Sequence, residues 1–440
     1  MGLLEHPDLP TDDIQGDIVP GFRGKEDLHY AQHFLLLRVV DRDRAREELK
    51  GLLPELTTAA AAVSAPGEPA MATSTNVGFT FAGLRELAPE VDLDSVFQAH
   101  EAFRSGLAER SHSKIRIDDE EAPFGLLGPS TEWTVGKDAH VVLNLGGRDE
   151  KLLAGHVEAV KHRVAGGFGK PSEQPGAVLN GRQREPFGFA DGLSQPRVRG
   201  FHLPRAGSVV PPLPADRFLV ADGHPVTTNG SFMVWVRFLQ NRAEFEAHCD
   251  KVARKLDLSG YDQADAPGVA AMEVGRRTDG TSLTRSPITA ARHVTDPGDA
   301  FDYADDHLGR SCPRHAHVRK MNPRTPDAGD HAILRRGIPF RTNGEEGLIF
   351  VCYQASIEQQ FERLQAYWAN ATYEPEANAS PDPLISQRAR DGCIVEIPLP
   401  RGGSVPVKVT NTWILPTGGF YAFMPSLTGL THLLGGARQP

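Results

Sequence analysis

Both halves of the 440-residue sequence alternate strand-like segments with helix-like segments. In the first half, runs of apolar and β-branched residues predict strands, and leucines at helical spacing predict helices. The strands are expected at 31–40, 76–81 and 140–145, and the helices at 44–56 and 151–164. Short strands interleaved with helices in this way are typical of an α+β or α/β fold.

The alternation restarts in the second half, after a stretch rich in Pro, Gly and Asp at 203–225 that we interpret as a linker. Strands are expected at 231–240 and 347–354, and helices at 241–256 and 356–370. The last of these helices has the clearest local signals. Ser356 and Gln359 match a capping box, and four large apolar residues follow on one helical face, namely Ile357, Phe361, Leu364 and Trp368.

We therefore expect two α+β domains of related design, spanning residues 1–205 and 226–440. A final strand is expected at 418–427. The segments 261–300 and 370–385 are rich in Asp, Ala, Pro and Thr, which predicts surface loops.

The bulk composition excludes several classes of protein. The formal net charge of -10 argues against a general nucleic-acid binder. The strongest apolar run, at 33–40, is too short to span a bilayer, and no signal peptide is recognised, so we expect a cytoplasmic protein without membrane contact. No CxxC pair occurs, which argues against a disulfide framework; the four cysteines are Cys249, Cys312, Cys352 and Cys393.

A carboxylate flanked by glycines marks the segment 185–196, EPFGFADGLSQP. Glycines allow tight bends and close approach of a ligand to the backbone, and Phe187 and Phe189 offer apolar surroundings to Asp191. A carboxylate in such a setting can exchange protons. On this segment alone, an aspartate that caps its own turn is the simpler interpretation.

Two histidines lie in the segment 311–324, SCPRHAHVRKMNPR. With Cys312, His315 and His317 suggest a metal cluster, yet no fourth ligand stands at a customary zinc spacing. A single histidine that binds haem iron is the other functional interpretation. By spacing alone, a solvated or hydrogen-bonded histidine explains the segment as well.

Two adjacent arginines lie in the segment 333–340, ILRRGIPF, between apolar residues and a Gly-Ile-Pro turn. From 310 to 341 there are eight basic residues and two acidic ones, in a chain that is acidic as a whole. A solvated basic face accounts for the excess, and a small polyanion such as a pair of haem propionates also fits it.

Taken together, the three segments resemble one family, the dye-decolorizing peroxidases. GFADG at 188–192 resembles the family's GxxDG signature. The segment 316–324 is similar to its proximal-histidine segment, and 333–340 to its distal-arginine segment. The segment 13–22, DIQGDIVPGF, resembles the start of the longer bacterial and fungal members, and the likeness continues through the C-terminal half.

This resemblance implies two ferredoxin-like α+β domains with antiparallel sheets, as in the dimeric α+β barrel superfamily, enclosing one haem b per chain. It makes His317 the proximal iron ligand and His315 a bystander, because the family's ligand directly precedes the Val-Arg pair. Asp191 becomes the distal acid–base group. Arg335 becomes the distal cation, with Arg336 in reserve.

Further residues receive roles from the same resemblance. The expected haem contacts are Phe189, Gly192, Leu348, Phe350 and, through a propionate, Arg319; Asp382 is a guess for the acceptor behind the iron ligand. The expected reaction reduces hydrogen peroxide and oxidises phenolics or dyes through a ferryl intermediate. Electrons from bulky substrates could pass through Trp368, Trp413, Tyr353 or Tyr421.

Two alternatives stay open. A haem-handling protein of the same fold would store haem or remove its iron. A non-haem metal protein would use Cys312, His315 and His317 instead. For the peroxidase, the expected partners are peroxide and small-molecule reductants, without nucleic acid or membrane, and a homo-oligomer is compatible with the sequence.

Overall fold

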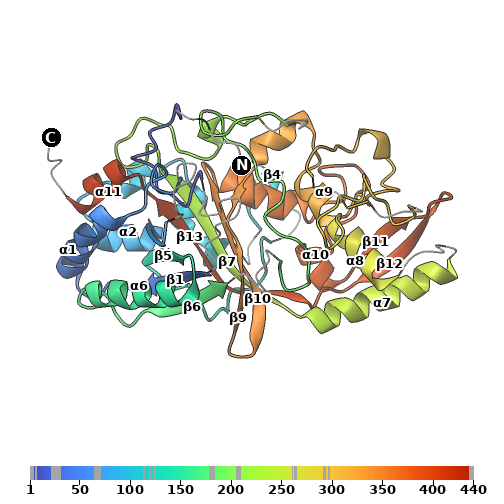
Figure 1. Ribbon diagram of the computed structural model, residues 1–440, viewed down its shortest axis with the longest axis horizontal. Helices are drawn as coiled ribbons and strands as arrows, with labels where there is room; N and C mark the ends of the chain where they lie inside the picture. Colours follow the sequence, from blue (N-terminus) through green and yellow to red (C-terminus); the bar gives the residue numbers. More distant parts are fainter. Residues whose placement is uncertain are drawn as a thin grey trace.

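One large antiparallel sheet forms the centre of the computed structural model (Figure 1). Its nine strands follow the order β6-β1-β5-β2-β13-β7-β10-β8, and β9 pairs with β10. The two halves of the sheet meet where β2 pairs with β13, at Phe79 and Phe423. The structure describes residues 4, 7–20, 31–63, 71–111, 114–117, 120–122, 125–177, 184–204, 210–259, 261, 265–290, 294–295 and 298–435.

The first half of the sheet contains β1 (Ala31–Leu37), β2 (Thr73–Phe79), β5 (Val141–Gly147) and β6 (Ser172–Ala177). Numbered within this half, the spatial order is fourth, first, third, second, which is the ferredoxin-like arrangement that the resemblance implies. The expected strands and helices are all present, within a few residues of their predicted ends. Helices α1 (Arg42–Leu52) and α6 (Glu150–Arg163) flank these strands, and α6 packs directly on them.

The second half repeats the same order with β7 (Ser231–Gln240), β8 (Leu334–Arg335), β9 (Ile338–Thr342), β10 (Glu345–Gln354) and β13 (Ile414–Met424). Numbered within this half, β13 is the fourth strand, β7 the first, β10 the third, and β8 with β9 the second. The expected α+β class with antiparallel sheets is thereby confirmed. The division of the chain at residues 205 and 226 stays a prediction.

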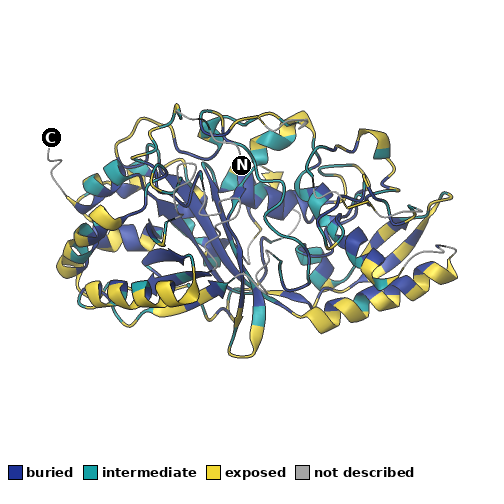
Figure 2. Cartoon of the chain, viewed as in Figure 1, coloured by how far each residue is buried: buried dark blue, intermediate teal, exposed yellow. Residues whose placement is uncertain are grey.

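A second core lies beside the main sheet, at the right of Figure 1. It is enclosed by α7 (Arg242–Leu258), α8 (Ala266–Val274) and the hairpin of β11 (Cys393–Pro398) and β12 (Ser404–Val409). The outer face of α7 is exposed, whereas the faces turned toward this core are buried (Figure 2). The shorter helices and strands are α2 (Phe81–Leu87), α3 (Leu93–Val96), α4 (Glu101–Ser105), α5 (Leu107–Arg110), β3 (Arg116–Ile117), β4 (Glu120–Glu121), α9 (His317–Met321), α10 (Gln387–Asp391) and α11 (Leu427–Leu434).

Three segments that were expected to be linker or loop contain buried residues, so the prediction that 261–300 and 370–385 lie wholly at the surface is wrong. Phe218 in the expected linker is fully buried, as is Leu283 in the first expected loop, which also contains α8. Asn370 and Asp382 in the second expected loop are fully buried as well. Polar composition misled at Asn370 and Asp382 because their side chains form hydrogen bonds within the protein rather than with water.

The helix expected at 356–370 is present, but its central turns are π-helical, at Glu358–Glu362 and Leu364–Trp368. Its backbone bonds reach five residues back, for example from the Glu362 N–H to the Ile357 carbonyl at 2.9 Å. The four apolar residues predicted to share one face are all buried. The Ser356 hydroxyl caps the Gln359 N–H as expected, whereas the reciprocal bond comes from Gln360.

A buried N-terminal strap, residues 13–19, ties the two halves together. The Gln15 side chain donates to the carbonyls of Val77 and Pro425, and Asp13 accepts the N–H of Thr428. Asp17 accepts hydrogen bonds from Asn144 and from Tyr353. Within the described residues, no helix is both long and apolar enough for a membrane crossing.

Candidate active site

The Asp191 loop, residues 188–196, has positive φ angles at three residues and is held in place by a buried carboxyl group. Gly188 and Gly192 have φ angles of 96° and 75°, as the flanking glycines of the sequence predict, and Ser194 has a φ of 56°. Glu185 accepts the N–H groups of Phe187 at 3.0 Å and Phe189 at 2.9 Å. Burial raises the pKa of Glu185. Phe187 and Phe189 are buried in the second core and anchor the loop, while Asp191 is half-buried.

Arg335 lies on the short strand β8 and binds the Asp191 loop directly. Its Nη2 donates to the Leu193 carbonyl at 2.6 Å, and its backbone N–H donates to Gln195 Oε1 at 3.1 Å. Its guanidinium therefore lies beside the loop that carries Asp191. Among the described residues, no ion pair joins the Asp191 and Arg335 side chains, so the remaining donors of Arg335 are available to a ligand.

The neighbouring Arg336 points the other way, as expected for adjacent residues at a strand end. It is 6% exposed, and it donates to the carbonyls of Asp17, Ile18 and Val19 in the N-terminal strap. The sequence distinguished the two arginines only by motif register. The structure gives a physical reason to prefer Arg335 as the distal cation, because the Arg336 guanidinium already donates hydrogen bonds to the strap.

His317 begins helix α9, and its ring is held by a buried carboxylate. Its Nδ1 lies 2.8 Å from Oδ2 of Asp382, whose side chain is fully buried, whereas the His317 side chain is 29% exposed. The other oxygen of Asp382 accepts the N–H groups of Leu384 and Ile385. A carboxylate beside Nδ1 favours the tautomer in which Nδ1 donates the hydrogen bond and Nε2 has the lone pair. Nε2 has no partner in the described part of the chain.

His315 occupies a different environment. It is 1% exposed, its Nε2 has no hydrogen-bond partner among the described residues, and burial lowers its pKa. Cys312 is fully buried too, and burial raises the pKa of its thiol to about 12. Within the described ranges, no group of three or more His, Cys, Asp or Glu could hold a metal ion. The structure therefore gives no support to the non-haem cluster of Cys312, His315 and His317.

Arg319 does not occupy the place expected of a propionate partner. It is 1% exposed, and two of its nitrogens bind the two oxygens of Glu376 at 2.7 Å each. Its third nitrogen binds Asp306 and the Cys312 carbonyl, and the guanidinium stacks over the Tyr303 ring at 4.5 Å. The role of Arg319 as a propionate partner stays a prediction that these contacts do not favour, because protein carboxylates already surround the guanidinium.

Sequence reasoning missed a cluster of four polar side chains that grips the Asp191 loop. We call Ser194, Arg276, Asp299 and Arg324 the Ser194 cluster. The Ser194 hydroxyl donates to Asp299 and accepts from Arg276 at 2.6 Å and Arg324 at 3.1 Å. Arg324 is the last residue of the segment 311–324, which contains His317, so the cluster joins the second motif to the first. The only signal in the sequence was the basic excess between 310 and 341.

The Ser194 cluster also has an unused donor. Within the described part of the chain, the buried Nε–H of Arg324 has no acceptor. Both Arg276 and Arg324 lie over the Phe301 ring, at 5.1 and 3.8 Å from its centroid, and share a single carboxylate, Asp299. Burial lowers the pKa of Arg276, and the charges of Arg324 and Arg335 add to this. A cluster with surplus positive charge and a free buried donor suits an anionic group.

Strand β10 presents apolar surface to the same region. Ile349 and Val351 are fully buried, whereas Leu348 and Phe350 are only half-buried, although β10 has hydrogen-bonded neighbours on both sides. Phe350 contacts the rings of Phe238 and Phe361, at 6.5 and 5.9 Å between centroids. Leu348 and Phe350 thus lie on the face of the strand that retains accessible apolar surface, as expected for residues that wall a flat ligand.

The four proposed electron relays are core residues rather than surface residues. Trp368 is 4% exposed, Trp413 3%, Tyr353 0% and Tyr421 1%. The Tyr353 hydroxyl donates to Asp17 in the strap, and the Tyr421 hydroxyl donates to Glu362 at 3.0 Å. None of the four therefore offers a surface on which a bulky substrate could dock.

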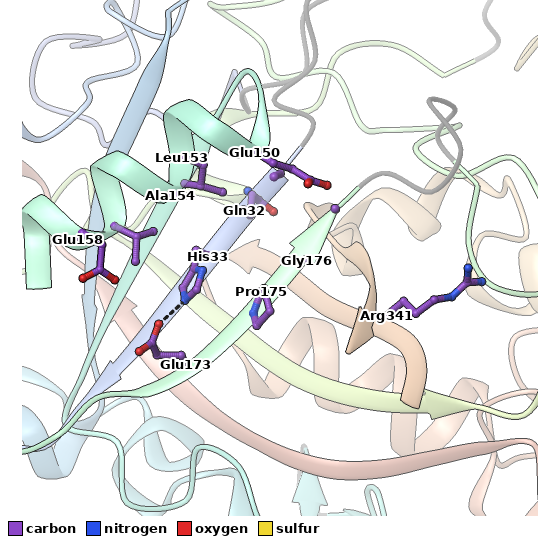
Figure 3. Close-up of a pocket in the computed structure, with 13 residues that line it drawn as sticks. Gln32, His33, Glu150, Leu153, Ala154, Glu158, Glu173, Pro175, Gly176 and Arg341 are labelled. Carbon is purple, nitrogen blue, oxygen red and sulfur yellow. Dashed lines mark hydrogen bonds and ion pairs between the residues drawn. The ribbon is translucent and has the colours of Figure 1, made fainter. Parts of the chain in front are cut away.

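A pocket of about 400 Å³ lies elsewhere in the molecule, beside β1, α6 and β6 (Figure 3). In it, His33 Nε2 lies 2.9 Å from Glu173, and burial lowers the pKa of His33 despite this carboxylate. The residues that line this pocket include none from the three motif segments. We therefore build the active site on the hydrogen bonds that join those segments and not on this pocket.

Comparisons with known proteins agree with the geometry. Residues 183–377, which contain all three motifs, match the family model described as Dyp-type peroxidase, C-terminal. The multifunctional dye peroxidase DyP2 of an Amycolatopsis species is 30% identical over 64% of this chain and 68% of its own length. The dye-decolorizing peroxidase msp1 of Mycetinis scorodonius is 28% identical over 97% of this chain and 88% of its own length.

Solved structures give the same result. A dye-decolorizing peroxidase complex with 2,6-dimethoxyphenol superposes with a TM-score of 0.79 at 25% identity, over 97% of this chain and all of that one. An ancestral D-type dye-decolorizing peroxidase reaches a TM-score of 0.80 at 25% identity, over 98% of this chain. The chain therefore belongs to the dye-decolorizing peroxidase family and is an oxidoreductase that acts on peroxide.

Proposed function

We propose that this protein binds one haem b per chain, reduces hydrogen peroxide, and oxidises bulky organic substrates such as phenolics and dyes. The observation that carries the proposal is the convergence of the three motifs. Arg335 and Arg324 both bind the Asp191 loop, at Leu193 and Ser194, and Arg324 ends the segment 311–324 that contains His317. These bonds join the segments that carry the proposed iron ligand, acid–base group and cation, and this supports a single site.

The residues present fit a haem. His317 offers Nε2 to iron, Arg324 offers a buried donor without a partner to a propionate, and Leu348 and Phe350 offer apolar surface to the ring. Bound haem would supply the iron that accepts peroxide and the redox equivalents that the protein side chains lack.

Asp191 would move the proton. Peroxide must lose a proton to become a good nucleophile, and its far oxygen must gain one to leave as water. A single carboxylate can do both, provided that it stays close to the two oxygens in turn. The loop geometry supports this role, because the Gly192 N–H donates to Asp191 Oδ1 at 2.6 Å and orients the carboxylate, while the other oxygen is left for peroxide.

Arg335 would stabilise the negative charge that develops as the O–O bond breaks. Its position is fixed by the Leu193 carbonyl before any substrate arrives, and such preorganised cations act without reorganisation at the moment of reaction. The His317–Asp382 hydrogen bond would keep the imidazole in one tautomer and raise its basicity as a ligand.

The proposal also covers the domain division, residues 1–205 and 226–440. It is supported by the repeated strand order of the two halves of the sheet. In this arrangement the Asp191 loop comes from the first half, whereas His317 and Arg335 come from the second. The site would then lie where the two halves meet.

Titration of haem into the apoprotein tests the proposal. We expect a Soret band that saturates at one haem per chain, followed by peroxide-dependent oxidation of an anthraquinone dye. Absence of a saturable Soret band would refute the haem site.

A deferrochelatase of Escherichia coli O157:H7 matches over 15% of this chain at 38% identity. Release of iron-free porphyrin without peroxide would favour that alternative, iron removal from haem.

The adjacent arginines allow a matched comparison. Arg335→Met should lower the second-order rate constant for peroxide by about 10²–10³, the usual effect of losing one transition-state donor, at little cost in stability. Arg336→Met should instead lower the free energy of unfolding by at least about 3 kcal/mol, because three buried carbonyls of the strap lose their donor. Stopped-flow absorbance and urea denaturation measure the two effects. Equal effects of both substitutions would contradict the division of roles.

Asp382→Asn tests the support of the iron ligand. The amide keeps a similar shape but loses the charge, and losing such a partner costs metal sites about 10–100-fold in affinity or activity. We expect faster haem transfer from the variant to apomyoglobin and a shifted Soret band. Asp330→Asn is the control, because the Asp330 side chain lies at the surface, where it forms an exposed ion pair with Arg217. Unchanged transfer and spectrum in Asp382→Asn would contradict this role.

A further inference from the structure

We propose that Ser194 is a positioning residue that couples the Asp191 loop to the segment carrying His317, so that the distal acid–base group and the proximal ligand are held at a fixed spacing. The inference rests on the proposed function, since it assigns Asp191 and His317 to opposite sides of one haem. It concerns a serine that itself touches neither peroxide nor iron.

The hydroxyl of Ser194 is fully used. A hydroxyl has one donor and two acceptor lone pairs. Here the donor serves Asp299, and the two lone pairs accept from Arg276 and Arg324. Arg324 is in turn fixed by an ion pair with Asp299 and by the carbonyls of Asp299 and Phe301. A methyl group at this position would therefore remove three bonds at once.

Because of its position in the chain, Ser194 links the Asp191 loop to the segment that contains His317. Ser194 is separated from Asp191 by two residues, and Arg324 lies seven residues after His317. The carbonyl of Leu193, next to Ser194, accepts from Arg335. The end of the Asp191 loop is thus held at two successive residues by two arginines, one from each of the other motif segments. If the bond between Arg324 and Ser194 is lost, the loop can rotate about the remaining bond between Arg335 and the Leu193 carbonyl.

The backbone at Ser194 shows that its side chain is needed. A φ of 56° lies in the left-handed region, which glycine enters freely and other residues enter at a cost. Strain of this kind persists only where the surroundings fix the residue, and it gathers at functional sites. The Ser194 cluster supplies that fixation, because without its hydroxyl a glycine would be the better residue here.

Two substitutions separate the hydroxyl from the strain. Ser194→Ala removes the hydroxyl and keeps the strained backbone, while Ser194→Gly removes both. The control is Ser404→Ala on β12, where the serine also donates to a carboxylate, Glu396 at 2.6 Å, in the hairpin far along the chain from the three motifs. Each variant is measured for amide hydrogen exchange of residues 188–196 in the apoprotein, for thermal unfolding, and, loaded with haem, for its rate with peroxide.

We expect faster exchange of the loop and at least about a tenfold lower peroxide rate constant in both Ser194 variants, because small misplacements of a reacting group are costly. Ser194→Gly should unfold at a higher temperature than Ser194→Ala and yet react as slowly. Haem content and the KM for the reducing dye should not change, and Ser404→Ala should match the unsubstituted protein in all readouts.

The inference is overturned if Ser194→Gly exchanges and reacts like the unsubstituted protein, because the hydroxyl would then position nothing. It is also overturned if the rate falls only in proportion to lost haem, which would make the cluster a haem-binding element alone. Failure of the unsubstituted, haem-loaded protein to react with peroxide would instead refute the proposed function. The hydrogen-exchange comparison in the apoprotein would still decide whether Ser194 fixes the loop.

Discussion

Asp191→Asn is expected to lower the second-order rate constant for reaction with hydrogen peroxide by about 10²–10⁴, the usual contribution of a positioned acid–base group. The amide keeps the size of the carboxyl group and can still accept the Gly192 N–H, so the loop should keep its shape. It cannot take up and return a proton. Stopped-flow measurement of the haem absorbance after mixing with peroxide gives the rate constant directly.

The control for this substitution is Asp222→Asn. Asp222 also lies in a loop and accepts hydrogen bonds from His224 and Thr227, but it belongs to none of the three motifs. We expect it to leave the peroxide rate unchanged, and haem content should be the same in all three proteins. An Asp191→Asn protein that reacts as fast as the control would show that the proton is handled elsewhere.

His317→Ala is expected to lose haem, or to hold it far more weakly than the unsubstituted protein. Removing a supporting partner of a metal ligand already costs about 10–100-fold, and removing the ligand itself should cost more. The substitution also removes the His317 partner of Asp382 Oδ2, while Oδ1 keeps its bonds from the N–H groups of Leu384 and Ile385. Haem content after gel filtration and the Soret spectrum are the measurements.

Two further samples make the result specific. His315→Asn changes the neighbouring histidine, which is buried and unrelated to the site, so it should cost stability and keep haem. Free imidazole added to His317→Ala should restore part of the Soret spectrum, because it can enter the space left by the missing ring. Haem binding and a spectrum that survive His317→Ala untouched would show that the ligand assignment is wrong.

The sequence predicted the strands and main helices well because they depend on local periodicity. The two-part alternation corresponds to the two halves of one sheet, which repeat the same strand order. It could not predict the π-helical turns at 358–368, since helix type there depends on what packs around the segment rather than on the spacing of Phe361, Leu364 and Trp368.

The candidate site also has a part that the sequence predicts and a part that only the structure shows. The residues in the motifs, and Asp382 as the partner of His317, could be named from the sequence, but the partners that hold the Asp191 loop could not. Asp299 bonds to a serine 105 residues away, and Arg324 to the same serine 130 residues away. Such pairs leave no local pattern. The polar composition around Asp299 predicted only a surface loop.

Arg319 is a residue whose predicted role its partners in the structure do not favour. Its place in the motif made it a reasonable propionate partner, whereas the structure surrounds it with Glu376 and Asp306. Arg324 is the better candidate for the anion-binding role that we propose, because its buried Nε–H is unused within the described residues. The sequence could predict that an arginine would bind the anionic group. Choosing among the neighbouring arginines required their hydrogen-bond partners in the structure.

Peroxide-dependent oxidation of an anthraquinone dye by the haem-loaded protein, followed from acidic to neutral pH, tests the central claim most directly. The account predicts turnover that requires both haem and peroxide and that falls by about 10²–10⁴ in Asp191→Asn under the same conditions. A haem-loaded protein that oxidises no dye at any pH in this range would contradict the account.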